Sequence, residues 1–333
     1  MPDALRGLVF VLGVGVSLGA SWILVARLER IGKRLRFSEA LLGMVAALAA
    51  DAPEITAAVT ALVDHNRAVG AGVILGSNAF NLAALLGLSA LFAGYIALHR
   101  RVVLMNGAVA LWVAVSCLLM VVGALSLALA LALTLIVLLP YLAVLAAGGG
   151  GLARLPLRAS WIGWLADAVG EEELELEDAI HPSVGGLRDG GLALAALFIV
   201  VGASVAMEQE ASTLGARWAV APILVGGLVL AAVTSLPNAV AGIYLAARGR
   251  GAATLSTALN SNLLNVFAGL MIPGAILGLG APSAESSLVA IAYAALTAFA
   301  LICAFVDRGL RRAAGGVIIV AYVAFAVALI AGA

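Results

Sequence analysis

Apolar residues occur along this chain in long runs that are separated by short polar segments. Each run holds roughly 20 residues, the length that an α-helix needs to cross the hydrocarbon core of a bilayer. The pattern predicts an all-α polytopic membrane protein with ten spans. The expected spans are residues 7–26, 39–63, 69–94, 102–122, 124–147, 190–207, 218–247, 252–279, 286–306 and 313–332.

Composition agrees with a membrane protein, and the distribution of charge suggests its orientation. Of 333 residues, 64% are hydrophobic and only 11% are charged, too few for the surface of a soluble protein. Eighteen basic and eighteen acidic residues cancel, which excludes a basic surface for nucleic acid. All Lys and Arg except Arg6, Arg67 and Arg217 fall in alternate loops, which the positive-inside rule assigns to the cytoplasm. Both termini are then expected outside.

The chain contains an internal repeat. A shift of 184 residues brings prolines and polar residues into register: Pro53 with Pro237, Ser77 with Ser261, Asn78 with Asn262 and Asn81 with Asn265. Ala and Leu matches mean little in so apolar a chain, whereas polar matches at equal spacing inside two membrane segments indicate duplication.

The repeat also predicts the domain organisation. Its copies lie within 39–94 and 218–279, and the five spans that separate corresponding helices reverse their direction in the membrane. We therefore expect two inverted five-helix halves, 1–147 and 190–333, joined by a cytoplasmic acidic linker loop, 148–189. Transporters with this plan place their site at the bilayer midplane, between the copies.

Each copy carries a proline in mid-span beside polar residues. Proline frees a carbonyl one turn earlier, which is tolerated at this depth only against protein or a watery cavity. Pro53 and Pro237 are therefore expected to break their helices at a site, a simple packing kink being the alternative. Asp51 and Glu54 share one helix face at a depth where a carboxylate costs at least about 2.5 kcal/mol. An ion or proton site is expected there, and an acid that is merely protonated or paired is the alternative.

A second polar cluster closes each copy, at residues 76–81 and 260–265. In each, a Ser and an Asn are four residues apart, so their oxygens share one helix face. Such residues can also join helices by hydrogen bonds, but four Asn in register with the acidic helix favour ligation or support of an ion. The clusters offer only oxygen ligands, which suit sodium, calcium or magnesium and not zinc or copper.

These paired motifs resemble the alpha repeats of the cation/calcium antiporter superfamily, which includes the sodium/calcium exchangers. The matching stretches are 50–54 with 76–81 and 234–238 with 260–265, and the likeness covers most of both halves. In that family two proline-broken helices and their partners surround the transported ions, while the first and sixth helices slide across the core. The resemblance implies that the cation site is lined by Glu54, Asn81, Ser77, Asn238, Thr234, Ser235, Ser261 and Asn265. Asp51 is expected to be the second acid of the site and, with Glu54, a candidate metal ligand. Asn78 and Asn262 are expected to support these ligands.

The second copy departs from the family pattern. Asn238 stands where the family usually has an acid, and Asn265 is neutral where some exchangers place Asp. Ala50 and Asp51 replace a Thr-Ser pair, and Asn260 replaces a glycine. Two carboxylates can neutralise one divalent ion, but they offer few counter-charges for several sodium ions at once.

The linker contains an acidic run: Glu171, Glu172, Glu173, Glu175, Glu177 and Asp178. It lacks the glycine and alternating Asp of a calcium-binding loop, which argues against a regulatory calcium site. A solvated, partly helical linker is the expected structure.

We expect a secondary antiporter that exchanges calcium or a related divalent cation for sodium or protons by alternating access. No nucleophile–base constellation, phosphate loop or redox motif suggests an enzyme. The alternatives are a monovalent cation/proton exchanger or divergent family member with another cargo, and a non-transporting scaffold or sensor. The expected partners are the bilayer of a prokaryotic plasma membrane and small inorganic cations, with no cofactor and no nucleic acid. A monomer is compatible with this expectation.

Overall fold

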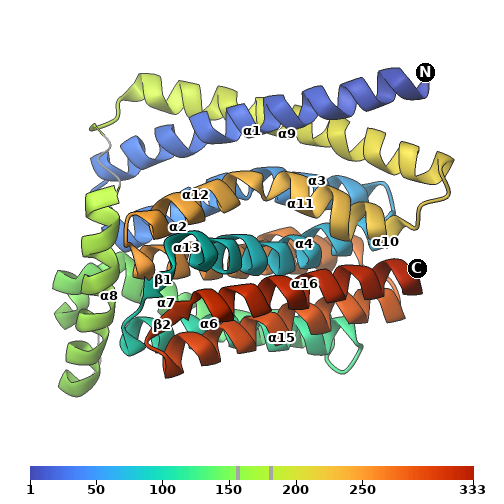
Figure 1. Cartoon of the computed structure of the whole chain (residues 1–333). Coiled ribbons are helices and arrows are strands. Elements are labelled where there is room, and N and C mark those ends of the chain that lie inside the picture. Colours follow the sequence, from blue (N-terminus) through green and yellow to red (C-terminus); the bar gives the residue numbers. More distant parts are fainter. Residues whose placement is uncertain (155–157, 180–182) are drawn as a thin grey trace.

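The computed structural model is built almost entirely of helices, most of which run along a common axis (Figure 1). It describes residues 1–154, 158–179 and 183–333, so both gaps fall in the expected linker. The part before the first gap contains α1 (Asp3–Arg34), α2 (Glu39–Ala50), α3 (Ala52–Val63), α4 (Arg67–Asn81), η1 (Leu82–Leu88), α5 (Ser89–Ala93), β1 (Tyr95–Ala97), α6 (Arg100–Val121), α7 (Leu127–Gly151) and η2 (Leu152–Arg154). The rest contains α8 (Ala159–Ala179), α9 (Leu187–Arg217), α10 (Pro222–Leu224), η3 (Val225–Leu230), α11 (Ala231–Thr234), α12 (Leu236–Ala247), α13 (Gly251–Leu264), η4 (Asn265–Met271), α14 (Ile272–Leu277), α15 (Ala284–Val306), β2 (Gly309–Arg311) and α16 (Arg312–Gly332).

The helices account for the ten expected crossings. In the described chain, eight helices are long and apolar enough to span a membrane, and two bent pairs bring the number to ten. Both termini lie at the end of the bundle opposite α8, as an even number of crossings requires (Figure 1). The predicted all-α polytopic fold is therefore confirmed. The short strands β1 and β2, which the sequence did not predict, pair antiparallel with Ile96 opposite Leu310.

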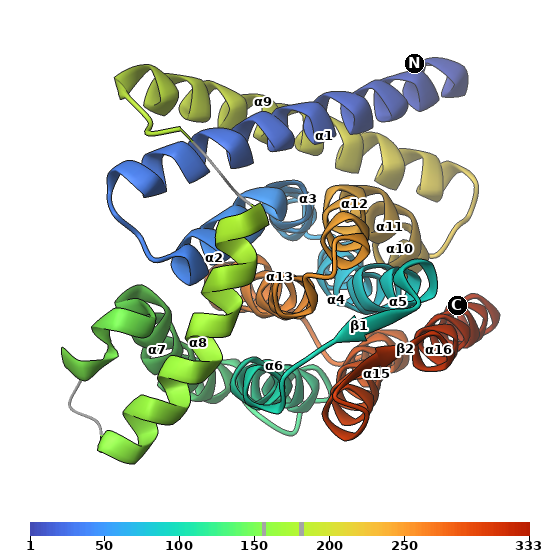
Figure 2. The same cartoon turned by 60° about the vertical axis from the view of Figure 1, so that its left-hand side comes forward.

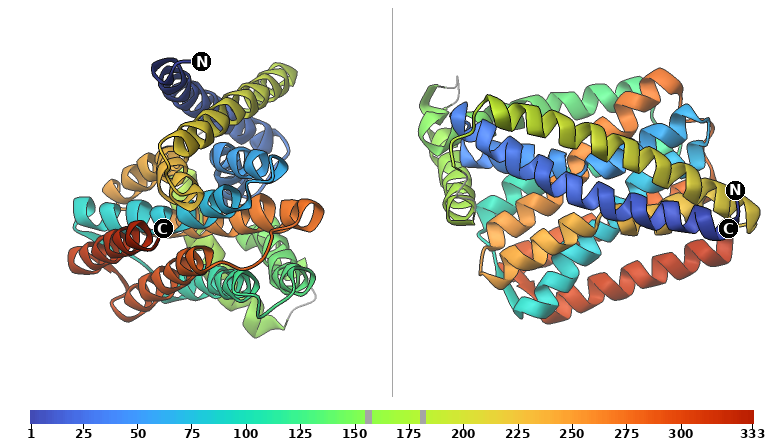
Figure 3. Two further views of the ribbon diagram at one scale, coloured as in Figure 1. Left: turned by 90° about the vertical axis from the view of Figure 1, so that its right-hand side faces the viewer. Right: turned by 90° about the horizontal axis from the view of Figure 1, so that it is seen from above.

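The helices α1 and α9 form a layer of their own, which crosses the remaining helices (Figure 3). Small residues let the two helices approach: a Cβ on Gly13 would lie 3.2 Å from the Ala203 carbonyl oxygen, and the Ser17 and Ser204 hydroxyls hydrogen bond at 2.8 Å. Both helices extend well beyond the predicted spans 7–26 and 190–207. Ion pairs between their charged ends, such as Arg6 with Glu210, accompany this extension.

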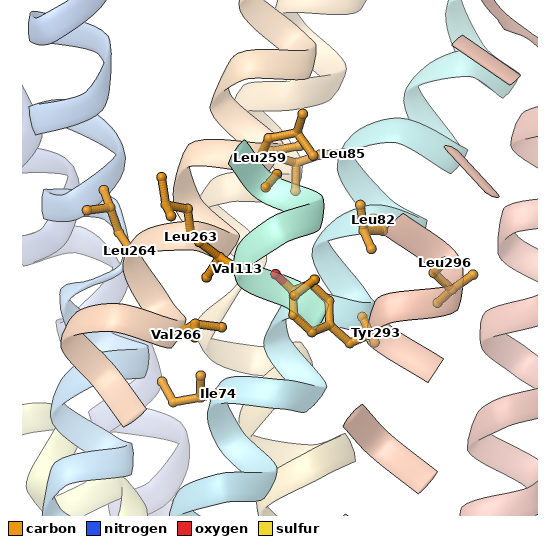
Figure 4. Close-up of a cluster of buried hydrophobic side chains, with 14 of the residues drawn as sticks. Ile74, Leu82, Leu85, Val113, Leu259, Leu263, Leu264, Val266, Tyr293 and Leu296 are labelled. Atoms are coloured by element: carbon orange, nitrogen blue, oxygen red, sulfur yellow. The ribbon is translucent and has the colours of Figure 1, made fainter. Parts of the chain in front are cut away.

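The central helices α4 and α13 belong to different halves of the chain. They are surrounded by α2, α3, α6, α12 and α15 (Figure 2). Large apolar side chains from several of these elements meet beside them, among them Leu85, Val113, Leu259 and Tyr293, all of which are buried (Figure 4). The polar clusters of both repeats are thus carried on the two most enclosed helices.

The two halves touch backbone to backbone where α4 meets η3. A Cβ on Gly76 would lie only 2.2 Å from the Gly227 carbonyl oxygen, and one on Gly226 only 2.3 Å from the Val69 carbonyl oxygen. Only glycine fits at such contacts, since any side chain would push the helices apart. These glycines therefore set the distance between the two repeats.

The helix α8 crosses the ends of the other helices, at the end of the bundle away from the termini (Figure 1). It is helical, as expected, but not a solvated linker. Glu172 and Leu176 are fully buried, and Leu176 packs against Gly43 of α2. Glu175 Oε2 accepts a hydrogen bond at 2.9 Å from the Ala253 backbone N–H, in the first turn of α13. Glu172 and Glu175 of the acidic run are therefore part of the packed structure, whereas the side chains of Glu177 and Asp178 lie outside the described ones.

Glu172 joins α8 to three membrane helices. Its Oε2 accepts a hydrogen bond at 3.0 Å from Asn106 Nδ2 on α6. The Tyr141 hydroxyl of α7 contacts Asn106 and donates to Asn260 Oδ1 at 2.8 Å. Asn260, which stands where the family motif has glycine, thus connects α13 to this buried network. The pKa of Glu172 is raised from 4.5 to about 7, mainly by burial and to a smaller extent by the nearby Glu173 and Glu175.

The Gly76 contact can be tested by adding one methyl group. Gly76→Ala should lower the free energy of unfolding by about 1–3 kcal/mol or more, because the opposing group is backbone that cannot rotate away. Gly202→Ala is the matched control, since a Cβ there meets nothing within 4 Å. Thermal unfolding in detergent measures both. Equal midpoints for the two variants would contradict the close approach.

Docking of α8 should depend on pH through Glu172. Its folded pKa lies above that of the unfolded chain, so the docked helix holds the proton more tightly and docking weakens as pH rises from 4.5 to about 7. The loss is at most about 3 kcal/mol. Glu172→Gln should reduce the dependence and keep α8 docked at pH 8, whereas Glu285→Gln, the same change in the first turn of α15, should retain it in full. Hydrogen exchange of α8 at pH 5 and 8, corrected for intrinsic rates, tests this; identical protection of the native helix at both would contradict it.

Candidate ion-binding site

Two broken helices form the centre of the candidate site. Pro53 and Pro237 occupy the first turn of α3 and α12, and a single residue separates each of these helices from the preceding one. The residues at the breaks are Asp51, with φ −80° and ψ −3°, and Ser235, with φ −83° and ψ 0°. The bends are 47° and 46°. The two copies thus break at equivalent positions and by nearly the same angle, as the repeat predicts.

The carbonyl that Pro53 leaves without a helical donor belongs to Ala49, four residues earlier. Ser21 of α1, which is fully buried, donates its hydroxyl to this carbonyl at 3.2 Å. A residue of the crossing layer therefore satisfies the backbone at the first break. This role of Ser21 was not predicted from the sequence, in which Ser21 is simply a polar residue within an apolar span.

Each carboxylate of the first repeat is bonded by a residue of the second. Asn238 Nδ2 donates to Asp51 Oδ1 at 2.7 Å, and Ser235 Oγ donates to Glu54 Oε1 at 2.9 Å. The shift of 184 residues relates Asp51 to Ser235 and Glu54 to Asn238, so these two hydrogen bonds are equivalent. The two breaks face each other across a pseudo-two-fold axis.

The Asn clusters obey the same symmetry. Asn78 Nδ2 donates to the Asn262 carbonyl at 3.0 Å, and Asn262 Nδ2 donates to the Asn78 carbonyl at 3.1 Å. Likewise, Asn81 Nδ2 donates to Asn262 Oδ1 at 3.1 Å, and Asn265 Nδ2 donates to Asn78 Oδ1 at 3.2 Å. Asn78 and Asn262 therefore link α4 to α13, and each accepts a hydrogen bond from a candidate ligand of the other repeat.

The structure buries every residue expected to line the cation. Exposure is at most 1% for Asp51, Glu54, Ser77, Asn81, Thr234, Ser235, Asn238, Ser261 and Asn265. Ser261 donates to Asp51 Oδ1 at 2.6 Å and accepts from Asn81 Nδ2 at 3.1 Å, which ties the broken helices to the central pair. Thr234 instead donates to the Leu230 carbonyl of its own segment at 2.9 Å.

Five buried side-chain oxygens of this site have no hydrogen-bond partner. They come from both repeats: Asp51 Oδ2, Glu54 Oε2, Ser77 Oγ, Asn81 Oδ1 and Asn265 Oδ1. Throughout the described residues, no Lys, Arg or His is buried that could neutralise the two acids. Unpaired buried oxygens of this kind are costly, and a hard cation is the partner that their chemistry suits.

The site is poor in carboxylates. In the described parts of the chain, no group of three or more His, Cys, Asp or Glu side chains is placed to hold a metal ion. A cation bound here would therefore be coordinated by Asp51 and Glu54 together with neutral amide and hydroxyl oxygens. This set suits a hard cation better than zinc or copper, which favour nitrogen and sulfur ligands.

Each central helix changes its winding at the site. The π-helix η1 begins immediately after Asn81, and η4 begins at Asn265, the equivalent residue. A π-helical turn inserts an extra residue per hydrogen-bonded ring and is frequent at functional sites. These turns could not be predicted from the sequence, since the residues that follow Asn81 and Asn265 are apolar, as in an ordinary membrane helix.

Comparison with known proteins identifies the family. The sodium/calcium exchanger protein family matches residues 6–147 and 190–331, most of the chain. The chain belongs to this family. The resemblance inferred from the polar motifs is thereby confirmed, and the two matched segments leave out the 148–189 region. Among curated protein sequences, none is similar enough to match.

Solved exchanger structures share the fold. The sodium-calcium exchanger NCX_Mj is 20% identical with a TM-score of 0.65, and the match covers 98% of this chain and 99% of that one. The H⁺/Ca²⁺ exchanger CAX is 13% identical with a TM-score of 0.72, covering 99% and 86%. Native YfkE is 14% identical with a TM-score of 0.66, covering 99% and 93%. At these identities the comparison establishes the architecture alone.

The symmetric Asn pairs make a matched prediction. Asn78→Ala and Asn262→Ala should each lower the free energy of unfolding by about 1–3 kcal/mol, since each removes a buried side-chain hydrogen bond to a carbonyl of the other repeat and the oxygen that accepts from a buried amide. The two losses should be similar, because the bonds removed are equivalent. Ser89→Ala, which removes a buried hydroxyl that has no partner, should change stability little. Thermal unfolding in detergent gives all three values, and a large difference between the Asn variants would disprove the symmetric arrangement.

Proposed function

We propose that this protein is a secondary active antiporter that exchanges calcium, or a related divalent cation, for sodium or protons by alternating access. Asp51 and Glu54 bind the divalent cation and, after its release, the counter-ion. Amide and hydroxyl oxygens of both repeats complete the coordination shell. This class of transport is supported by the sodium/calcium exchanger family to which the chain belongs. It is also supported by solved structures of similar fold that are described as sodium-calcium and H⁺/Ca²⁺ exchangers.

The observation that carries the proposal is the set of five unpaired oxygens around two carboxylates. Most buried side-chain oxygens with a purely structural role are bonded to donors, as the Oδ1 atoms of Asn78 and Asn262 are. Here the free oxygens come from both repeats and belong to the residues that the sequence motifs single out. Calcium takes six to eight oxygen ligands, mixing carboxylates with neutral oxygens, and the site offers such a mixture.

The two acids also limit the exchange. Two negative charges balance one divalent ion, and two protons or two monovalent cations leave the site equally neutral. Asn238 and Asn265 add no charge, so a larger load of sodium would be electrostatically uncompensated at this depth. We therefore expect exchange of one divalent ion against at most about two monovalent charges bound by these acids.

The hydrogen bonds to the acids suit an exchanging site. Ser235 and Asn238 each hold one oxygen of a carboxylate and leave the other free. The carboxylates are thereby oriented before a cation arrives, which lowers the cost of binding. In every state of the proposed cycle, the two carboxylates keep their hydrogen bonds to the second repeat.

Transport in sealed vesicles tests the proposal. Purified protein in proteoliposomes should take up calcium when an outward sodium or proton gradient is imposed. Glu54→Gln should reduce uptake to the level of empty vesicles, because a single carboxylate cannot neutralise the ion. Glu285→Gln makes the same chemical change in the first turn of α15, away from the site, and should leave uptake unchanged.

The outcome of that experiment separates the alternatives. Failure of native protein to move any divalent cation under either gradient would refute the proposal. Sodium/proton exchange in the same vesicles without divalent transport would support the monovalent alternative, for which Asn238 is the motivating residue.

A further inference from the structure

A third buried acid of the membrane helices lies outside the site already described. Glu208 of α9 is 1% exposed. Its Oε1 accepts a hydrogen bond from Ser212 at 2.7 Å, while its Oε2 is buried without a partner. The predicted span ended at residue 207, just before it, but α9 continues to Arg217 and carries Glu208 into a packed position.

Glu208 lines a cavity of about 380 Å³ between the crossing layer and the rest of the bundle. The opposite wall comes from Asp64 and Asn66, in the turn between α3 and α4. Arg6 also lines the cavity, but it is paired with Glu210 at 2.7 Å. No ion pair with Lys, Arg or His is found for Glu208 or Asp64 across residues 1–154, 158–179 and 183–333. The cavity thus carries uncompensated negative charge.

We propose that this cavity is a second cation-binding site, which takes a hard divalent cation such as calcium between Glu208 and Asp64. The unpaired Oε2 of Glu208 and the Asp64 carboxylate supply the charge, and the side chains of Asn66 and Ser212 supply neutral oxygens. None of these ligands offers an imidazole nitrogen or a sulfur, which are the donors that suit zinc or copper.

The second site is separate from the first. Asp64 follows Glu54 by ten residues along α3, which is about 15 Å of helix, toward the end of the bundle where both termini lie. Its two acids belong to different structural units, since Glu208 is on α9 and Asp64 is at the end of α3. A cation bound between them bridges the crossing layer to the bundle and cancels the repulsion between the two carboxylates.

Calcium binding in detergent tests this inference without any transport measurement. In the Asp51→Asn/Glu54→Gln background, equilibrium binding of radioactive calcium should retain one weak site per chain. Adding Glu208→Gln or Asp64→Asn should weaken that residual binding at least about tenfold. Adding Glu285→Gln should leave it unchanged. Asp64 is exposed, so its variant reports on the site even where Glu208→Gln disturbs folding.

Two results would overturn the second site. One is the absence of residual calcium binding once Asp51 and Glu54 are neutralised. The other is residual binding that survives both Glu208→Gln and Asp64→Asn. Neither depends on whether the protein transports calcium, so failure of the proposed transport function would leave this test intact.

Discussion

Two carboxylates buried at mid-membrane depth without a cationic side chain are the constraint on which the rest of the structure depends. Bringing such groups out of water is tolerable only when hydrogen-bond donors or a cation offset the loss of hydration. Among the described residues, the side-chain donors to Asp51 and Glu54 are Ser235, Asn238 and Ser261, all of the second repeat. The two halves must therefore meet at hydrogen-bonding distance in the interior.

That requirement accounts for the packing around the site. Hydrogen bonds of 2.6–2.9 Å between the halves require that their backbones lie close together. The contact of Gly76 with Gly227, which no side chain separates, allows this close approach. The Asn pair that links α4 to α13 fixes the relative height of these helices, because each side chain bonds the backbone of the other. Because the motif is duplicated, the same sequence pattern provides both partners of each symmetric hydrogen bond.

Much of this could be predicted from the sequence, because membrane depth makes polar residues rare and therefore informative. Asp51 and Glu54 stood out for that reason. The parts that could not be predicted depend on partners distant in the chain. Glu172 and Leu176 are four residues apart and share a face of α8, a pattern that also fits an exposed amphipathic helix. Only the packing of α6, α7 and α13 shows that Glu172 is buried beside Asn106. Likewise, Glu208 is buried only because α9 extends past the predicted end of its span.

The departure of the second repeat from the family pattern has a physical consequence for the two acids. An acid at position 238 would place a carboxylate 2.7 Å from Asp51, the distance that the Asn238 amide now spans as a donor. Two such charges could not both ionise without a cation between them. With an amide there, the second repeat instead donates a hydrogen bond to Asp51. The neutral second repeat thus offers less charge to balance a cation, and in return it supplies the donors that hold Asp51 and Glu54 in place.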